Sequence, residues 1–546
     1  MTSPARIRPS ALTPRPVRDL CTRFAVTLAP AAVADSPRAH TATEVFEQVT
    51  VSSVASDNRV CADGDLFVAL PGGHVHGARF AADAVRRGAT AVLTDAAGSQ
   101  AIAADATMPP GIPVLIADDP RALLGPIAAW VFGQPAEALD SFAVTGTNGK
   151  TTTVFLLDHL LRALGVTPGL VGTVLMRAGD RVLPSTLTTP EAADLQALLA
   201  SMAQDNVTAL SMEVSSHALA LHRVDGVVFD VAGFTNLTQD HLDFHGTMEA
   251  YFEAKALLFT PDHAQRGVVC VDDRWGELMA HRALIPVTTV RTLPASLTSP
   301  PADWVVSDVE PYGTGSAFTL TFREGRSLRT HVSLPGDFNV SNAALALVMA
   351  LQVFPFDRVA AAVEAAGGMD ASVPGRMEVV GDSPRVVVDF AHNTEALMLA
   401  LAALRATTQG RLVVVTGAAG DRDAGKRPAM GAAAAQGADI VIITDDDPHC
   451  EDPAAIRAAV LAGARDAAAS NDRQVDVSEI PDRSDAIIAA ITQATAYDTV
   501  LVAGRGHETI QEVAGIEHHL DDREVARQAL LWRSDRAYPP PQGAQW

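Results

Sequence analysis

The feature that most constrains the fold is the segment SFAVTGTNGKTTTVFLLDHLLRALG at residues 141–165. A short apolar run leads into a glycine-containing turn, and a helical stretch follows the turn. Gly146 and Gly149 permit positive φ and close approach of the backbone, while the amides of such a turn and the helix dipole attract an anion. Lys150 can reach the outer phosphates of a nucleotide, and the Thr151 hydroxyl can bind Mg²⁺. The segment therefore predicts a strand, a phosphate-binding loop and a helix.

The loop is a shortened form of the common phosphate-loop pattern. That pattern has a glycine five residues before Gly149, where this chain has Val144, so the match is to a T-G-T-N-G-K-T-T form. The alternative is an ordinary βα turn with a surface lysine. The strand before the turn and the helix after it favour phosphate binding.

The region before this loop indicates an α/β fold. Short strand-like runs alternate with Ala- and Leu-rich helical stretches, which is typical of parallel sheets covered by helices. We expect strands at residues 65–70 and 90–95, with a helix at 78–87 between them.

The region after the loop continues the same alternation. We expect strands at 209–214, 227–234 and 268–271, followed by a more irregular stretch at 300–334. The small and turn-forming residues GGMDASVPG at 367–375 indicate a hinge or linker.

Four strand-like runs after this linker each stop at a polar loop. They are RVVVDF before AHN, RLVVVTG before AAGDRDAGKRP, DIVIITD before DDPHCEDP, and TVLVAG before RGHE. Ligands of open parallel sheets bind outside the carboxyl ends of the strands, so these four loops predict one shared site.

The length of 546 residues is enough for three to four domains, each with its own core. We divide the chain into a flexible N-terminal tail and lead-in at 1–39, domains at 40–139, 140–372 and 373–535, and a C-terminal tail at 536–546.

The composition excludes several classes of protein. A formal charge of -23 argues against a general affinity for nucleic acid or anionic lipid. No uncharged apolar run reaches the ~18 residues of a membrane span, and the N-terminus has no apolar stretch of a secretory signal. The four cysteines lack disulfide or zinc spacing, so we expect a cytoplasmic protein with no membrane insertion.

Two further segments carry candidate metal ligands. Glu213 lies at the end of a predicted strand, where a carboxylate can hold the magnesium of a bound nucleotide. The segment TNLTQDHLDFHG contains Asp240, His241, Asp243 and His245. Its pattern alone favours a solvated loop, and a zinc site fits less well because the remaining ligands are missing.

Lys255 lies in the apolar helical segment GTMEAYFEAKALLF. The pattern alone favours a lysine whose stem lies on apolar surface while its ammonium reaches water. The alternative is a desolvated lysine with a lowered pKa, which could capture CO₂ as a carbamate and bind a second metal ion.

In chain order, these motifs resemble those of the Mur ligase family, most closely its MurE members, which add the third residue of the peptidoglycan stem peptide. The resemblance extends from about residue 50 to 530 and includes TGTNGKTT, EVSSHAL, NLTQDHLDFHG, YFEAKALLF, LPGDFNVSNAALAL, VPGRMEVV, VDFAHN, GAAGDRDAGKRP and GRGHE. It implies an N-terminal UDP-substrate domain, a central P-loop ATPase domain and a C-terminal Rossmann-like domain that receives the amino acid.

The resemblance also implies roles for individual residues. Those implied for ATP are Thr145, Gly146, Thr147, Asn148, Gly149, Lys150, Thr151, Thr152, Asn342, Arg376 and Asp389. Those implied for the UDP-linked substrate are Asn58, Thr188, Thr189, Ser215 and Arg223. Those implied for the amino acid are Arg422, Asp446, Asp447, His449, Gly504 and Glu508.

The implied cofactors are ATP and two Mg²⁺ ions. Thr151 and Glu213 would hold the first ion, while His241 and a CO₂-derived carbamate on Lys255 would hold the second. The implied catalytic set consists of Lys150, Glu213, His241 and Lys255.

The implied reaction is ATP-driven amide formation between UDP-N-acetylmuramoyl-L-alanyl-D-glutamate and a diamino acid, through an acyl phosphate, by a monomer. The rivals are a folylpolyglutamate-synthase-like ligase and an ATP-hydrolysing switch or scaffold. Departures from the family pattern at Asn58, His76 and Leu221 affect the uridine contacts.

The loop Asp446-Asp447-Pro448-His449 stands where diaminopimelate-adding members carry Asp-Asn-Pro-Arg. A histidine lacks the forked donors with which arginine grips a carboxylate, and the surrounding acidic residues repel one. We therefore expect L-lysine first and L-ornithine second, with meso-diaminopimelate as the alternative.

Overall fold

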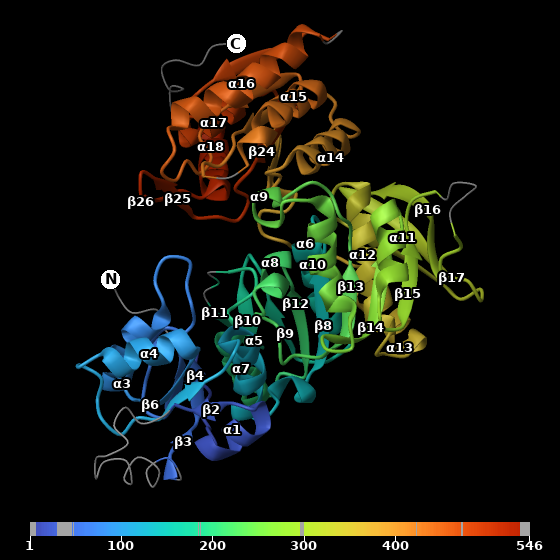
Figure 1. The fold of residues 1–546 in the computed structure, drawn as a ribbon. Helices are drawn as coiled ribbons and strands as arrows, with labels where there is room; N and C mark the ends of the chain where they lie inside the picture. The colour runs from blue at the N-terminus through green and yellow to red at the C-terminus, as the bar shows by residue number, and fades with distance from the viewer. Residues whose placement is uncertain are drawn as a thin grey trace.

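The computed structural model describes residues 7–29, 46, 48–183, 185, 187–294, 300–421, 423–470 and 473–535. The described chain forms three successive α/β units (Figure 1), with the blue N-terminal unit and the orange C-terminal unit on either side of a green central one. None of the helices within these ranges is long and apolar enough to cross a membrane.

The N-terminal domain is built on a five-stranded sheet, and the strands and helix expected near residues 65–95 are confirmed. The strand order is β2 (Thr27–Leu28), β7 (Val114–Ile116), β6 (Ala89–Thr94), β5 (Asp65–Val68) and β4 (Ser53–Ala55). The helices are α3 (Ala81–Arg86), α4 (Ala96–Ala104) and α5 (Pro120–Val131).

The described part of the expected N-terminal tail is ordered structure, so that expectation is wrong there. Helix α1 (Val17–Phe24) buries Val17 and Leu20 completely in the core of the N-terminal domain. Strand β1 (Arg15–Pro16) pairs with β3 (Thr50–Val51). The physical reason is that two apolar side chains on one face of a short helix gain enough burial to fix it, although the flanking prolines suggest a loose segment.

The central domain contains an eleven-stranded sheet with a helical layer on each face. Its strand order is β11 (Arg181–Leu183), β10 (Met176–Ala178), β9 (Pro168–Val171), β12 (Ala209–Glu213), β8 (Asp140–Thr145), β13 (Phe229–Phe234), β14 (Ala264–Cys270), β15 (Val287–Arg291), β16 (Trp304–Tyr312), β17 (Gly315–Phe322) and β18 (Ser327–Val332).

The two faces of this sheet are covered by different helices. Helices α6 (Lys150–Ala163), α12 (Asp337–Leu351) and α13 (Phe356–Ala366) pack on one face, and α7 (Ala192–Gln204), α10 (Met248–Ala256) and α11 (Arg274–Arg282) pack on the other. Along β8 the side chains alternate between the two cores, since Phe142 and Val144 join the first and Ala143 joins the second.

The stretch at 300–334, expected to be irregular, forms the antiparallel strands β16, β17 and β18. Phe318 and Leu320 of β17 are fully buried on one face, which is the alternation of a half-buried strand. Gly313 and Gly325 adopt positive φ of 58° and 95° in the two turns between the strands. These turns and the alternation give the segment a regular structure that its mixed composition conceals.

The C-terminal domain has a six-stranded sheet in the order β19 (Glu378–Asp382), β20 (Arg385–Asp389), β24 (Thr499–Ala503), β21 (Leu412–Thr416), β22 (Ile440–Ile443) and β23 (Asp476–Glu479). All four strands that we expected after the linker are present and parallel. Their polar loops meet at one edge: the Gly504 amide donates to the Asp389 carbonyl at 3.1 Å, and the Gly420 amide donates to the Asp447 carbonyl at 2.9 Å.

Candidate active site

The phosphate-binding loop lies between β8 and α6, as the sequence predicts. Gly146 has φ 148° and Gly149 has φ 87°. A Cβ at Gly146 would lie 1.8 Å from the Thr235 hydroxyl, and one at Gly149 would lie 2.3 Å from Oδ1 of Asn342. Both positions therefore require glycine for space as well as for backbone conformation.

Lys150 is folded over this loop. Its Nζ donates to the carbonyl oxygens of Gly146 at 2.9 Å and Thr147 at 2.8 Å. Burial lowers the pKa of Lys150, while nearby Glu213 and Asp240 oppose the shift. The ammonium is thus placed at the loop, where it can move to the phosphates of a nucleotide.

Glu213 organises the start of α6. One carboxylate oxygen accepts from the Thr151 hydroxyl at 2.9 Å, and the other accepts from the Thr173 amide at 2.8 Å. The Thr173 hydroxyl also donates to Thr188 Oγ1 at 3.0 Å. Thr189 donates to the Glu213 carbonyl at 3.0 Å. Thr151 of the predicted ATP set thus contacts the Glu213 carboxylate, while the predicted substrate residues Thr188 and Thr189 contact Thr173 and the Glu213 backbone.

Lys255 is 1% exposed, so the surface position that its sequence pattern favours is wrong. Its Nζ donates to the Gly146 carbonyl at 2.8 Å and lies 4.4 Å from the centre of the Tyr251 ring. Burial, and next the positive charge of Lys150, lower its pKa well below the usual lysine range. Such an amine is a much better nucleophile than an exposed ammonium.

The histidine segment folds beside Lys255. His241 lies 4.9 Å from the ring of His217 and 6.1 Å from that of Tyr251, and burial lowers its pKa to about 4. His245 donates or accepts at 2.9 Å with the Ser216 hydroxyl. At pH 7 the His241 imidazole is neutral, so it retains a nitrogen lone pair that can bind a metal ion.

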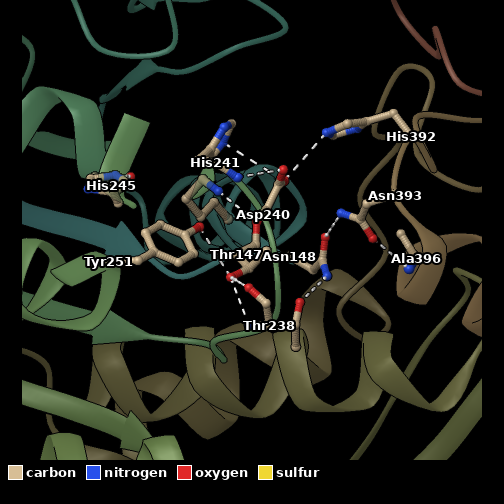
Figure 2. Close-up of polar contacts among 12 residues, drawn as sticks. Thr147, Asn148, Thr238, Asp240, His241, His245, Tyr251, His392, Asn393 and Ala396 are labelled. Atoms are coloured by element: carbon tan, nitrogen blue, oxygen red, sulfur yellow. Dashed lines mark hydrogen bonds and ion pairs between the residues drawn. The ribbon is translucent and has the colours of Figure 1, made fainter. Parts of the chain in front are cut away.

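Figure 2 shows that the same segment meets the C-terminal domain. A carboxylate oxygen of Asp240 lies 3.7 Å from Nε2 of His392, which follows β20. The Asn148 amide donates to Glu395 at 3.4 Å, and the Asn393 amide donates to Asn148 at 3.4 Å. The phosphate loop and the end of the C-terminal sheet therefore form one site.

The later residues predicted for ATP are also brought to the loop. Arg376 donates to the Thr151 hydroxyl at 3.3 Å and lies 4.1 Å from the centre of the Phe390 ring. Asp389 accepts from the Met377 amide at 2.6 Å, and burial raises its pKa. Asn342 accepts from the Thr153 hydroxyl at 3.3 Å, so α12 supports the first turn of α6 directly after the loop.

Two remaining threonines of the predicted ATP set lie beside the loop. Thr145 ends β8 and its buried hydroxyl has no hydrogen-bond partner among the described residues. Thr152 is buried in the first turn of α6. A buried hydroxyl without a partner is consistent with a ligand that completes the site.

The predicted amino-acid loop is held against the hairpin of β25 (Ile510–Val513) and β26 (Ile516–His519). Nδ1 of His449 lies 3.1 Å from a carboxylate oxygen of Glu512, and Asp447 accepts from the Glu512 amide at 2.7 Å. Burial raises the pKa of Glu508 to about 7, and Asp446 adds to the shift. This part of the site is rich in carboxylates.

Asp446 lies deeper than its neighbours. It is buried, with one oxygen 3.8 Å from a guanidinium nitrogen of Arg483, and burial raises its pKa. A Cβ at Gly504 would lie 2.1 Å from that carboxylate, so only glycine fits there. Arg422, the remaining residue of the predicted set, lies outside the described residues.

The N-terminal domain contributes a cavity of about 600 Å³ lined in part by Asn58, Arg121 and Glu191. The Asn58 amide donates to Asp83 at 2.8 Å. Arg223, one of the residues predicted for the UDP-linked substrate, places its Nε 2.9 Å from a carboxylate oxygen of Glu191. Ser215 begins α8 (Ser216–Ala220), where its hydroxyl accepts from the Ala218 amide at 3.1 Å.

Sequence reasoning missed three participants: Thr173, Tyr251 and His392. Tyr251 and Thr147 share a hydrogen bond of 3.2 Å between their hydroxyls. Thr173 follows the carboxyl end of β9, which is the signal that could have identified it. His392 belongs to the C-terminal domain and Asp240 to the central domain, so no local sequence pattern could have paired them.

The donor chemistry can be compared with what Mg²⁺ requires. The Thr151 hydroxyl and the Glu213 carboxylate are oxygen donors, which Mg²⁺ prefers, and they fit the first ion. An amine at Lys255 offers no oxygen, whereas its carbamate would offer two. No cluster of three His, Cys, Asp or Glu side chains suited to a metal occurs in the part of the chain that the structure describes.

Three family models match the chain. The Mur ligase middle domain matches residues 144–350, the Mur ligase glutamate ligase domain matches 375–506, and the Mur ligase family catalytic domain matches 50–129. Together they span the phosphate loop, the C-terminal sheet and the N-terminal cavity.

Individual relatives are similar over nearly their whole length. The chain is 46% identical to the UDP-N-acetylmuramyl-tripeptide synthetase of Leifsonia xyli subsp. xyli, with 89% of this chain and 92% of the relative covered. It is also 46% identical to the UDP-N-acetylmuramoyl-L-alanyl-D-glutamate–2,6-diaminopimelate ligase of Streptomyces coelicolor, with 88% and 92% covered. A solved structure of a ligase with this second name is 33% identical, with a TM-score of 0.60 over 90% of this chain and 96% of that one.

These names bear on the amino acid. The Streptomyces relative and the solved structure are named for 2,6-diaminopimelate, and the Leifsonia name specifies no amino acid. The expected preference for L-lysine therefore finds no support among them, and they favour the alternative.

Proposed function

Since the chain belongs to the Mur ligase family and is an ATP-dependent ligase, we propose that it joins UDP-N-acetylmuramoyl-L-alanyl-D-glutamate to a diamino acid in peptidoglycan synthesis. The observation that carries the proposal is the set of contacts around the phosphate loop. Lys150, Thr151 with Glu213, and Lys255 converge on it from three elements of the central domain.

The proposed reaction has two steps. The D-glutamyl carboxylate attacks the γ-phosphorus of ATP, which gives an acyl phosphate and ADP. An amine of the diamino acid then attacks the acyl carbon, and inorganic phosphate leaves with the electron pair of the broken C–O bond. Lys150 and Arg376 lie at the loop where negative charge gathers in the first step, so their cations would stabilise its transition state.

We assign Mg²⁺ binding to the oxygen donors Thr151 and Glu213, and a second ion to His241 with the carbamate of Lys255. The buried setting of Lys255 and the neutral imidazole of His241 support this assignment. When bound, the ions offset the repulsion among the anionic groups that must meet. The residues Thr173 and Tyr251 hold Glu213 and the loop in position.

For the diamino acid, the names of the relatives support 2,6-diaminopimelate. One observation favours L-lysine as a second candidate: Asp447 and Glu512 place two carboxylates at His449, against the guanidinium of Arg505 that lies 3.7 Å from Asp447. This excess of negative charge suits a free ammonium better than a second carboxylate. Arg422, which the motif implies for the amino acid, would supply a cation for that carboxylate.

The test is ligation by the purified chain with ATP, Mg²⁺ and the UDP-linked dipeptide, offering each diamino acid separately. We expect product only when the dipeptide and a diamino acid are both present. Replacing the dipeptide with a folate substrate should give none, which separates this proposal from a folylpolyglutamate-synthase-like ligase. ATP hydrolysis that ignores both substrates would support the switch or scaffold instead.

A further inference from the structure

Among the residues that the structure describes, Arg121 of the N-terminal cavity has few partners for its donors. Arg121, at the start of α5, lines this cavity of about 600 Å³ together with Phe67, Leu70 and Phe80. Polar side chains, among them Asn58 and Glu191, share the lining with these apolar residues, and a cavity of this size that combines apolar walls with convergent polar groups is typical of a small-molecule site. Its side chain is 30% exposed, so the guanidinium is accessible from the cavity.

The two arginines that line this cavity differ in how they are paired. Arg59 donates to both carboxylate oxygens of Asp57 at 2.7–3.0 Å, so its charge is neutralised locally. Arg121 has only weak partners among the described residues: its Nη1 lies 3.5 Å from Glu191 and 3.5 Å from the carbonyl oxygen of Leu221. A guanidinium has five N–H donors, so most of those on Arg121 can serve a ligand.

Glu191 does not neutralise Arg121, because it is shared between two domains. Its other oxygen lies 2.9 Å from Nε of Arg223 in the central domain. Glu191 occupies the position before α7 but its side chain does not cap the helix, so its carboxylate is available to both arginines. Two guanidinium groups and one carboxylate leave a net charge of about +1 at the edge of the cavity.

An anion is therefore favoured at this edge, and an apolar ring is favoured at the walls. We propose that Arg121 binds the diphosphate of the nucleotide-linked substrate and that Glu191 positions Arg121 from across the domain boundary. This inference rests on the proposed function for the identity of the substrate. The forked donors of arginine match two phosphate oxygens, which a lysine would contact only as a point charge.

The test compares binding of UDP and of uridine by the full chain and its variants. Arg121→Gln should weaken UDP binding about tenfold and leave uridine binding within about twofold. The reason is that the substitution removes a charged hydrogen bond to the phosphates, which uridine lacks. Arg121→Lys should recover part of the UDP affinity. Arg329→Gln is the matched control, because Arg329 of the edge strand β18 pairs with Glu310 of β16 at 2.8 Å, in the central sheet and away from the cavity.

Steady-state kinetics of ligation test the role of Arg121 during the reaction. Arg121→Gln should raise the KM for the UDP-linked dipeptide about tenfold, while kcat and the KM for ATP stay within about twofold. Equal weakening of UDP and uridine would show that Arg121 only shapes the cavity and would overturn the proposal. UDP affinity unchanged in Arg121→Gln, or absent in the unaltered chain, would also overturn it. If the unaltered chain binds UDP but ligates nothing, the proposed function fails while the UDP comparison still decides the role of Arg121.

Discussion

Lys150 and Lys255 donate hydrogen bonds to the same acceptor, the carbonyl oxygen of Gly146, with Nζ–O distances of 2.9 and 2.8 Å. Two buried ammonium groups this close repel each other, and this repulsion adds to desolvation in lowering the pKa of Lys255. Carbamylation of Lys255 would replace the repulsion by attraction. The pair thus gives a physical reason for the modification that the motif implies.

The first prediction is that Lys255 carries a carbamate. The chain has only three lysines, Lys150, Lys255 and Lys426, so a carbamate signal in ¹³C NMR with labelled bicarbonate has few possible sources. We expect one carbamate resonance that is absent from Lys255→Ala. Ligation by this variant should fall by about a hundredfold or more, and a short carboxylic acid should restore part of it. Full activity of Lys255→Ala would refute the assignment.

The second prediction concerns Glu213, which accepts hydrogen bonds from both Thr151 and Thr173. Glu213→Gln keeps the shape but removes the negative charge expected to hold Mg²⁺. We expect kcat to fall by about two orders of magnitude and the Mg²⁺ requirement to rise. The control is Glu310→Gln, which removes an exposed partner of Arg329. An unchanged Mg²⁺ dependence would show that Glu213 has only a structural role.

The third prediction is that the KM for the diamino acid depends on pH through Glu508. Burial raises the pKa of this carboxyl to about 7. Below this pH the carboxyl is mostly neutral, and above it the carboxylate can attract an ammonium group. The KM for the diamino acid should therefore fall between pH 6 and pH 8, and Glu508→Gln should flatten that part of the profile. A profile identical in the two proteins would exclude Glu508 as the titrating group.

The fourth prediction is that the C-terminal domain closes during catalysis. The contacts that it makes with the phosphate loop and the histidine segment are long, such as 3.7 Å between Asp240 and His392 and 3.4 Å between Asn148 and Asn393. ATP analogue and dipeptide together should reduce the radius of gyration in small-angle X-ray scattering. Identical curves with and without the ligands would count against closure.

Features that depend on neighbouring residues were predictable from the sequence. The phosphate loop and the four parallel strands of the C-terminal sheet each carry their signal within about ten residues, because strand, turn and helix formation are local. The α/β class and the shared edge of the C-terminal sheet followed from these segments.

Features that depend on tertiary packing were not predictable. Helix α1 owes its order to the burial of Val17 and Leu20 against distant strands. The approach of His392 to Asp240 and the sharing of Glu191 by Arg121 and Arg223 each join residues from different domains. No spacing along the chain encodes such contacts.

The most direct test of the account is mass spectrometry of the ligation product. The purified chain is given ATP, Mg²⁺, UDP-N-acetylmuramoyl-L-alanyl-D-glutamate and equal concentrations of meso-diaminopimelate, L-lysine and L-ornithine. We predict a UDP-linked tripeptide, one ADP released per product, and the mass increase of diaminopimelate in the main species. A main product that carries lysine or ornithine would show that the carboxylates at His449 determine which amino acid is added. ADP release without any tripeptide would contradict the central claim.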